Sequence, residues 1–326
     1  MLPSPSLTAL QDKIEEATQR LLPHVLETPL RRARGLGREV GSPVWLKCEH
    51  LQHTGSFKLR GATNKLLTLD GSARARGVVT ASSGNHGMAV AHACQRLQIP
   101  AVVFVPEGVI AAKAAAIRDL GASLRTHGDD CADTETHARE FALTQGLPFV
   151  SPYNDMDVIS GQGTVAGELV RQTRPLDVIY VAVGGGGLVA GIGAGLKRAW
   201  PDTDIVGCSP TNSAAMLDSL AAGEQLEVDS LPTWSDGTAG GLEAQTITFP
   251  LCAEVMTRTI KVSEDAILDG VRWLRRELNT VVEGAAGVAV AAMLEDSDRK
   301  ESDRIGLIVC GGNASAELRE VLGTEP

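Results

Sequence analysis

From residue 77 onward, short apolar runs alternate with longer amphipathic stretches along the chain. The apolar runs end at glycine, serine or proline and predict buried strands, whereas the alanine- and leucine-rich stretches between them predict helices. The expected strands lie at 77–81, 101–105, 122–125, 178–183, 204–208 and 304–309. The expected helices lie at 88–97, 111–120 (with Gly121 as its C-cap), 131–145, 188–200, 266–278 and 287–294.

This alternation predicts an α/β fold with mainly parallel sheets, right-handed crossovers and flanking helices. The composition agrees, because 43% of the 326 residues are hydrophobic, only 3% are aromatic and 35 are glycine. Such a core must be built from alanine, valine, leucine and isoleucine, as in parallel sheets. The length allows one or two domains. Two such sheets would place a ligand at the carboxyl ends of their strands.

The charge balance restricts the partners. A net charge of -10 argues against nucleic acid or an anionic membrane as a partner. Six scattered cysteines without a Cys-x-x-Cys pair favour free thiols in a reducing compartment. The N-terminal segment has no apolar run typical of a signal peptide. We therefore expect a cytoplasmic protein.

One uncharged stretch of 19 residues, 178–196, approaches the length of a membrane span. Seven of its residues are glycine, four of them consecutive, which a lipid-exposed helix tolerates poorly. A buried strand, a turn and the start of a buried helix explain the pattern better, so we expect no membrane partner.

The four glycines at 184–187 join this strand to this helix. Backbone N–H groups and the positive end of the helix make such a turn a phosphate site. Close packing of helix on sheet is the simpler explanation, but four consecutive glycines exceed what packing needs. The run from Gly185 to Ala190 also fits the dinucleotide fingerprint G-x-G-x-x-A. That fingerprint expects an acid at the end of the next strand, where this chain has Ser209 and Pro210, so a nicotinamide-dependent oxidoreductase is the weaker alternative.

A second turn, Ser-Ser-Gly-Asn-His-Gly at 82–87, lies between an expected strand and an expected helix. Its hydroxyls, carboxamide and imidazole at a helix N-terminus suit a substrate carboxylate, although an N-cap with a glycine turn would explain it alone. The histidine pairs lack a third ligand at useful spacing, so no metal site is expected.

Lys58 follows Phe57 just before an apolar helical run. Most lysines are solvated charges. This one precedes three glycine-rich turns, at 82–87, 184–187 and 310–313. A nucleophilic amine together with separate sites for an anion, a phosphate and a heterocycle is what a Schiff-base cofactor needs.

These segments together resemble the fold-type II pyridoxal-phosphate enzymes, in particular the serine/threonine dehydratase (ammonia-lyase) and serine racemase group. The motifs are Ser-Phe-Lys-Leu-Arg-Gly-Ala at 56–62, Ser-Ser-Gly-Asn-His-Gly at 82–87, the tetraglycine turn, and Cys-Gly-Gly-Asn at 310–313. They occur in the family's order, and the resemblance extends from about Thr28 to Asn313.

The resemblance implies a tryptophan synthase β-like architecture with two domains. Residues 1–70 and 152–326 would form a discontinuous large cofactor-binding domain, and 77–151 a small mobile domain. It implies pyridoxal 5'-phosphate (PLP) as cofactor, a small amino-acid substrate and a homodimer. No regulatory domain is expected after the catalytic region.

The resemblance also implies residue roles. Lys58 would link covalently to the cofactor and act as the catalytic base, and Phe57 would flank the ring. Asn85 would bind the phenolic oxygen, and Cys310 would face the pyridine nitrogen. The phosphate would be bound by Gly184, Gly185, Gly186, Gly187 and Leu188. The substrate carboxylate would be bound by Ser82, Ser83, Asn85 and His86.

A thiol at Cys310 with no acid nearby would not keep the pyridine nitrogen protonated. We therefore expect prompt loss of a β-hydroxyl: dehydration and deamination of L-threonine or L-serine to a 2-oxo acid and ammonia. A racemase in which Ser83 delivers a proton to the opposite face is the alternative within the family. Ser209 and Ala215 stand where the racemase-type metal site has acids, so no divalent metal is expected. A non-catalytic homologue is disfavoured by the intact Lys58. The pocket walls near 234–237 are expected to select the substrate side chain, and the sequence leaves bulky aryl-serines and 3-hydroxyaspartate open as further substrates.

Overall fold

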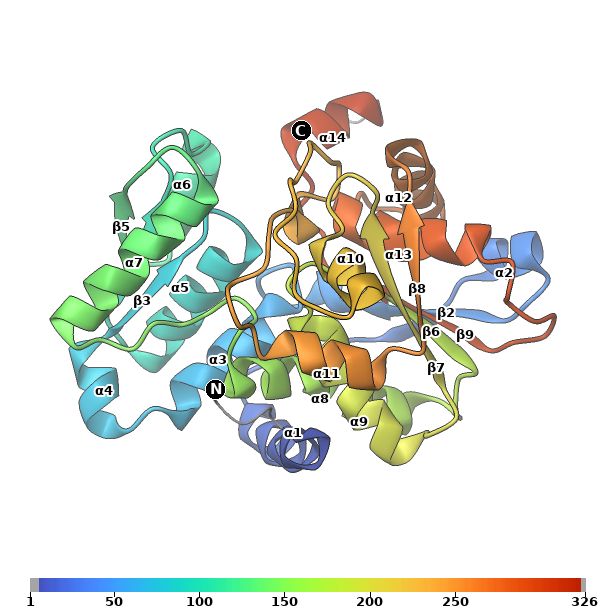
Figure 1. Ribbon diagram of the computed structural model, residues 1–326, viewed down its shortest axis with the longest axis horizontal. Coiled ribbons are helices and arrows are strands. Elements are labelled where there is room, and N and C mark those ends of the chain that lie inside the picture. The colour runs from blue at the N-terminus through green and yellow to red at the C-terminus, as the bar shows by residue number, and fades with distance from the viewer. Residues whose placement is uncertain (1–5, 324–326) are drawn as a thin grey trace.

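The computed structural model describes residues 6–323, which fold into two unequal lobes, each built around its own sheet (Figure 1). The larger lobe contains a six-stranded sheet in the order β1-β2-β9-β6-β7-β8. Neighbouring strands are parallel except for β1 and β2. Its strands are β1 (Leu30–Arg32), β2 (Val44–Cys48), β6 (Val178–Ala182), β7 (Asp204–Pro210), β8 (Arg258–Val262) and β9 (Ile305–Val309).

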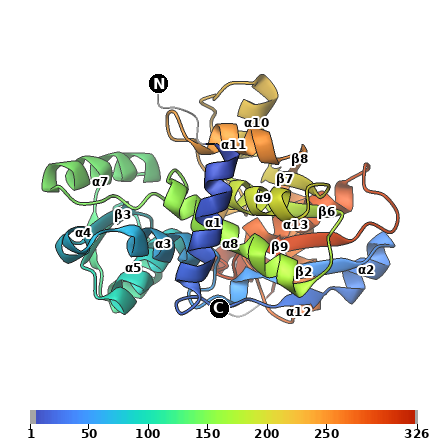
Figure 2. The same ribbon diagram turned by 90° about the horizontal axis from the view of Figure 1, so that it is seen from below.

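Helices cover both faces of this sheet, as Figures 1 and 2 show. α13 packs against the strands on one face, and α12 and α2 lie behind it, whereas α8, α9, α1 and α11 form the other layer. The helices of this lobe are α1 (Leu7–Leu21), α2 (Arg34–Val40), α8 (Met156–Gln172), α9 (Gly187–Ala199), α10 (Ala215–Ala222), α11 (Thr248–Val255), α12 (Glu264–Leu278), α13 (Gly284–Glu295) and α14 (Ala316–Val321), with short 3-10 turns η1 (Glu49–Leu51) and η2 (Asp236–Thr238).

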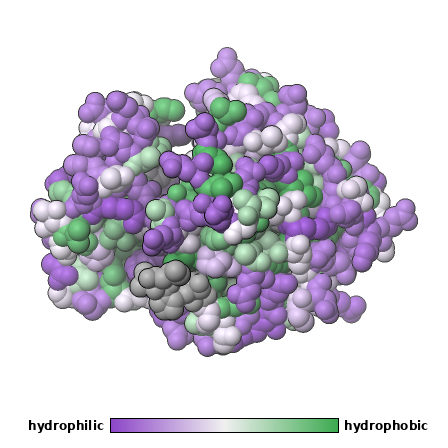
Figure 3. Space-filling model, in the orientation of Figure 1, coloured by the Kyte–Doolittle hydropathy of each residue, from purple (hydrophilic) through white to green (hydrophobic). Residues whose placement is uncertain are grey.

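The smaller lobe contains a parallel three-stranded sheet in the order β3-β4-β5. Its strands are β3 (Val78–Ala81), β4 (Ala101–Val105) and β5 (Ser123–Thr126), and its helices are α4 (Gly71–Arg76), α5 (Asn85–Leu97), α6 (Ala111–Asp119) and α7 (Cys131–Gln145). α3 (Lys58–Thr68) packs against both α5 and α8 and so connects the lobes. The face seen in Figure 3 is mostly hydrophilic and has a notch between the lobes.

The expected α/β class and parallel sheets are confirmed, and the expected helix at 131–145 has these bounds in the structure. Gly121 lies one residue after the C-cap Leu120, with a φ of 82°, where glycine is favoured. The sequence pattern does not predict β8, because the first four positions of this edge strand alternate between half-buried and exposed and two of its side chains are charged. Two further strands without a predicted counterpart, β1 and β2, lie before the regular alternation begins.

The uncharged stretch 178–196 divides into β6, a turn and most of α9, all largely buried in the protein. Among residues 6–323, the helices all fall short of the length and apolar character that a membrane crossing requires.

Candidate active site

The segments that carry the motifs follow the carboxyl ends of parallel strands. The Ser-Ser-Gly turn follows β3, the glycine turn follows β6, and Cys310 follows β9. Because parallel strands end on the same edge of a sheet, the topology brings Gly184 and Cys310 together, and α3 places Lys58 beside them. Ser56 forms an antiparallel bridge with Gly311, and the Phe57 N–H donates to the Cys310 carbonyl at 3.0 Å.

Lys58 is the first residue of α3 and is half-buried. Its Nζ donates to the Pro152 carbonyl at 2.9 Å and lies 5.3 Å from the centre of the Phe57 ring. Burial lowers the pKa of Lys58 to about 8, and the nearby Glu283 only partly opposes this shift. A larger fraction of this amine is therefore neutral near physiological pH than for an ordinary lysine, as a nucleophile or base requires.

A fully buried ionic cluster fixes the helix that carries Lys58. The Arg60 guanidinium binds Glu49 Oε2 at 2.7 Å and Glu168 Oε1 at 2.6 Å, and Lys47 pairs with the same Glu168. Two cations and two carboxylates balance in this cluster. Loss of one partner would leave an uncompensated buried charge. Arg60, two residues after Lys58, is therefore held in place, and with it the first turn of α3.

The glycine turn forms a narrow cradle at the N-terminus of α9. No side chain caps this helix, so the backbone N–H groups of its first turn remain available for a ligand. Gly186 has a φ of 84°, which favours glycine. A Cβ at Gly185 would lie 2.4 Å from the Tyr153 ring, and one at Gly184 would lie 2.9 Å from the Thr238 backbone. This uncapped, side-chain-free cradle fits a phosphate.

Asn85 links the two lobes across the site. Its Nδ2 donates to Glu283 Oε2 at 2.7 Å, and its Oδ1 accepts from Asn313 Nδ2 at 2.6 Å. Asn85 is the first residue of α5 in the small lobe, and Glu283 immediately precedes α13 in the large lobe. This contact therefore joins the two lobes.

Glu283 overturns one expectation from the sequence. An acid was not expected near Cys310, yet Glu283 Oε1 accepts from the Cys310 thiol at 3.4 Å. Burial raises the pKa of Glu283 to about 7, although the Asn85 hydrogen bond lowers it, and burial also raises the pKa of Cys310. The thiol thus stays protonated beside a carboxyl that titrates near neutrality. The available signal was that Glu283 is the only ionisable residue in 281–294.

The expected substrate-binding turn is formed by Ser82, Ser83 and Gly84. Ser82 Oγ accepts from the Gly84 N–H at 3.2 Å, and Ser83 is partly exposed. His86 is buried, and its Nε2 lies 3.0 Å from the Val150 carbonyl. Burial lowers the pKa of His86 to about 3, so the ring is neutral with its proton on Nε2. That imidazole has no second N–H for a carboxylate, whereas the backbone N–H groups at the start of α5 do face outward from the helix end.

The structure also places the predicted pocket wall and the two positions at which racemase-type enzymes have metal-binding acids. The Trp234–Gly237 segment lies near the site, since a Cβ at Gly237 would be 3.7 Å from Glu283 Oε1. Ser209 Oγ donates to the Val183 carbonyl inside the sheet, and Ala215 opens α10. Within the described part of the chain, no three histidine, cysteine, aspartate or glutamate side chains form a group suited to a metal.

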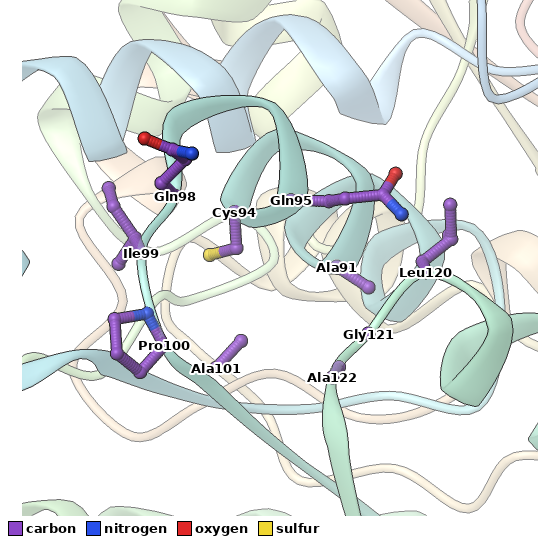
Figure 4. Close-up of a pocket in the computed structure, with 10 residues that line it drawn as sticks. All are labelled: Ala91, Cys94, Gln95, Gln98, Ile99, Pro100, Ala101, Leu120, Gly121 and Ala122. Carbon is purple, nitrogen blue, oxygen red and sulfur yellow. The ribbon is translucent and has the colours of Figure 1, made fainter.

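A hollow of about 240 Å³ lies elsewhere, at the far side of α5 (Figure 4). Its lining includes Cys94, Ile99, Leu120 and Ala122. Burial raises the pKa of Cys94 to about 12, so its thiol is unreactive, and this hollow has no catalytic group.

Comparison with known proteins identifies the family. Residues 21–311 match the sequence profile of the pyridoxal-phosphate dependent enzymes. This chain belongs to that family. The PLP-dependent chemistry expected from the motifs is thereby confirmed, and the dinucleotide alternative loses its support.

The individual relatives are named for different activities. The chain is 35% identical over 312 residues to an L-threonine ammonia-lyase of Thermotoga maritima, covering 96% of this chain and 77% of the relative. It is 35% identical over 311 residues to an L-threo-3-hydroxyaspartate ammonia-lyase of a Pseudomonas species, covering 95% and 97%. The structure is similar to maize serine racemase, with a TM-score of 0.89, 32% identity and 96% coverage of both chains. The architecture is therefore PLP fold type II.

Proposed function

We propose that this enzyme catalyses α,β-elimination of a β-hydroxy-α-amino acid, with L-threonine or L-serine as the substrate, giving a 2-oxo acid and ammonia. The observation that carries the proposal is the half-buried Lys58, whose pKa is lowered to about 8, beside an uncapped glycine cradle. The similarity to L-threonine ammonia-lyase supports the same reaction.

When bound, PLP supplies an electron-withdrawing imine that weakens the α-C–H bond of an amino acid. The protein supplies the remaining functions. The N–H groups of 184–188 bind the phosphate, and Phe57 flanks the ring. Lys58 Nζ would accept the α-proton as a neutral amine. We propose that Asn85 binds the phenolic oxygen and that Cys310 lies at the ring nitrogen.

Ser82, Ser83 and Asn85 are proposed to bind the substrate carboxylate at the N-terminus of α5. His86 contributes there through its backbone N–H, because its ring donates to Val150 instead. This turn and residues 77–151 as a whole are proposed to form the small mobile domain, with 1–70 and 152–326 as the large one. Separate sheets in the two lobes support that division.

The test is 2-oxo acid and ammonia release by PLP-loaded enzyme with L-threonine and L-serine. Lys58→Ala should abolish release and the visible absorption of the covalently bound cofactor, whereas Lys300→Ala, a change at an exposed lysine, should affect neither. Absence of product from every β-hydroxy amino acid despite a loaded Lys58 would refute the proposed reaction.

Racemisation is the second candidate, favoured by the similarity to maize serine racemase. In that case Ser83 would protonate the face opposite Lys58, and chiral analysis would find D-serine after incubation with L-serine. Ser83→Ala should then abolish inversion. The homodimer and the cytoplasmic location remain predictions, which sedimentation and cell fractionation would check.

A further inference from the structure

The segment between α7 and α8 contacts both the reactive amine and the glycine cradle. The Pro152 carbonyl accepts from Lys58 Nζ at 2.9 Å. The next residue, Tyr153, packs against the cradle. A Cβ at Gly185 would lie 2.4 Å from the Tyr153 ring, and one at Gly187 would lie 3.0 Å from the Tyr153 Cβ. The position of this segment therefore affects the amine and the expected phosphate site together.

Glu243 holds this segment, residues 151–154, through its side chain and its backbone. Its Oε1 accepts from Ser151 Oγ at 3.1 Å, and its Oε2 accepts from Asn154 Nδ2 at 2.8 Å. Its N–H donates to the Tyr153 hydroxyl at 2.7 Å. These three hydrogen bonds lie on both sides of Pro152 in the chain, so they fix the carbonyl that meets the reactive amine.

Glu243 is itself fixed by residues of both lobes. It lies in the segment between η2 and α11, where Gln225 Nε2 donates to its carbonyl at 2.6 Å. Arg139 of α7, in the small lobe, lies 2.6 Å from its Oε2 through Nη2. The same guanidinium nitrogen binds Glu135 Oε1 at 2.7 Å, and the two glutamates share a hydrogen bond. A side chain that supports a site from behind must be held in this way.

We propose that Glu243 is a positioning residue for the reactive amine and the phosphate site. By holding segment 151–154, it aligns Lys58 Nζ through the Pro152 carbonyl and keeps the Tyr153 ring against the glycine cradle. The inference rests on the proposed function, which assigns Lys58 and the cradle their roles. Displacement of a reacting group by about 1 Å costs about a hundredfold in rate, so loss of this support should slow the attack of the amine on the cofactor.

The test measures capture of PLP by the cofactor-free protein well above the lowered pKa of Lys58, about 8, so that the amine is neutral. Stopped-flow absorption gives the rate, and competition by inorganic phosphate gives the affinity of the cradle. We expect Glu243→Ala to slow capture about tenfold and to weaken phosphate binding about fivefold. Glu243→Gln should stay within about twofold of wild type, because its amide accepts from Asn154 and donates to the Ser151 hydroxyl.

Glu277→Ala is the matched control for a purely structural loss. Glu277 is half-buried like Glu243, and its Oε1 holds α2 by accepting from the Leu36 N–H at 2.7 Å. Figure 1 shows α2 at the end of the large lobe away from the small lobe. This control should lower the denaturant midpoint of unfolding, whereas its capture rate and phosphate affinity should equal those of wild type.

Wild-type capture and phosphate affinity in Glu243→Ala would overturn the proposal. An equal loss in Glu243→Gln or in Glu277→Ala would also overturn it, since the first keeps the hydrogen bonds and the second is remote. If Glu243→Ala does not fold, Tyr153→Phe decides the matter, because it keeps the ring and removes only the hydroxyl that accepts from Glu243. Capture should then slow about threefold, and an unchanged rate overturns the proposal.

The same measurements separate this proposal from the proposed reaction. Cofactor capture and phosphate binding require no amino-acid substrate. If Glu243→Ala slows capture as expected but loaded wild type releases no 2-oxo acid from any β-hydroxy amino acid, the proposed reaction fails and the positioning role of Glu243 is supported.

Discussion

The Cys310 thiol donates a hydrogen bond to the Glu283 carboxyl, with Sγ 3.4 Å from Oε1. The pair combines a thiol that stays protonated with a carboxyl whose pKa burial raises to about 7. The charge near Cys310 therefore depends on pH around neutrality. The sequence-based preference for elimination assumed that no acid lies near Cys310. The structure instead places the titratable carboxyl of Glu283 there.

The raised pKa of Glu283 predicts a pH-dependent stability. The folded carboxyl keeps its proton up to about pH 7, whereas an unfolded one loses it near 4.5. This contribution to stability is complete below pH 4.5 and is lost as pH rises through 7. Glu283→Gln cannot ionise, so its free energy of unfolding relative to wild type should increase by up to about 3 kcal/mol between pH 4.5 and 8. Denaturant unfolding of the cofactor-free protein measures this.

Glu140→Gln provides the control for that experiment, because Glu140 is exposed on α7. Its stability should follow wild type at every pH. Parallel curves for Glu283→Gln and wild type would contradict the raised pKa.

The lowered pKa of Lys58 predicts how cofactor capture depends on pH. Only the neutral amine attacks the cofactor aldehyde, so the capture rate should rise with pH and level off above about 8. With an ordinary lysine, the capture rate would continue to rise until the pH reached about 10.5, the usual pKa of the amine. Stopped-flow absorption after mixing cofactor-free protein with PLP measures the rate. A continued rise to pH 10 would show that the amine is not desolvated.

The glycine cradle predicts a steric effect on cofactor affinity. In Gly185→Ala, the new methyl group would lie about 2.4 Å from the Tyr153 ring, so the ring or the turn must move. We expect PLP affinity to fall at least about tenfold as the phosphate loses aligned N–H donors. Gly167→Ala is the matched control, because its nearest neighbour would be 3.6 Å away, within α8. Equal affinities in the two variants would argue against the cradle.

The buried ionic cluster predicts a large stability loss. Arg60→Met leaves Glu49 and Glu168 without their shared cation, and removing one partner from a buried pair costs about 3–5 kcal/mol. Arg272→Met removes only an exposed partner of Asp269, which should cost less than about 1 kcal/mol. Denaturant unfolding of both variants tests the contrast. Similar losses would mean that Arg60 is not the centre of the cluster.

The sequence by itself determined the fold class and the order of six of the nine strands and six of the fourteen helices in residues 6–323. Strand-helix alternation is a local property, since burial on both faces requires continuous apolar runs and crossover helices require a 3.6-residue period. Local sequence also identified the glycine turn at 184–187, because a helix N-terminus free of side chains is encoded in adjacent residues. Lys58 was identified by its motif at 56–62 together with that turn. The edge strand β8 escaped because its exposed positions break the apolar pattern.

Only the tertiary structure decided which distant residues surround Lys58. Glu283 lies 27 positions before Cys310 and reaches it because α13 packs beside β9. Glu135 of α7 and Glu243 of the segment before α11 come from different lobes, and both bind Arg139. Contacts of this kind depend on helix packing and strand order, which leave no periodic signal in the sequence. The pKa values near Lys58 depend on burial and charge at those contacts, so they too follow from the folded chain.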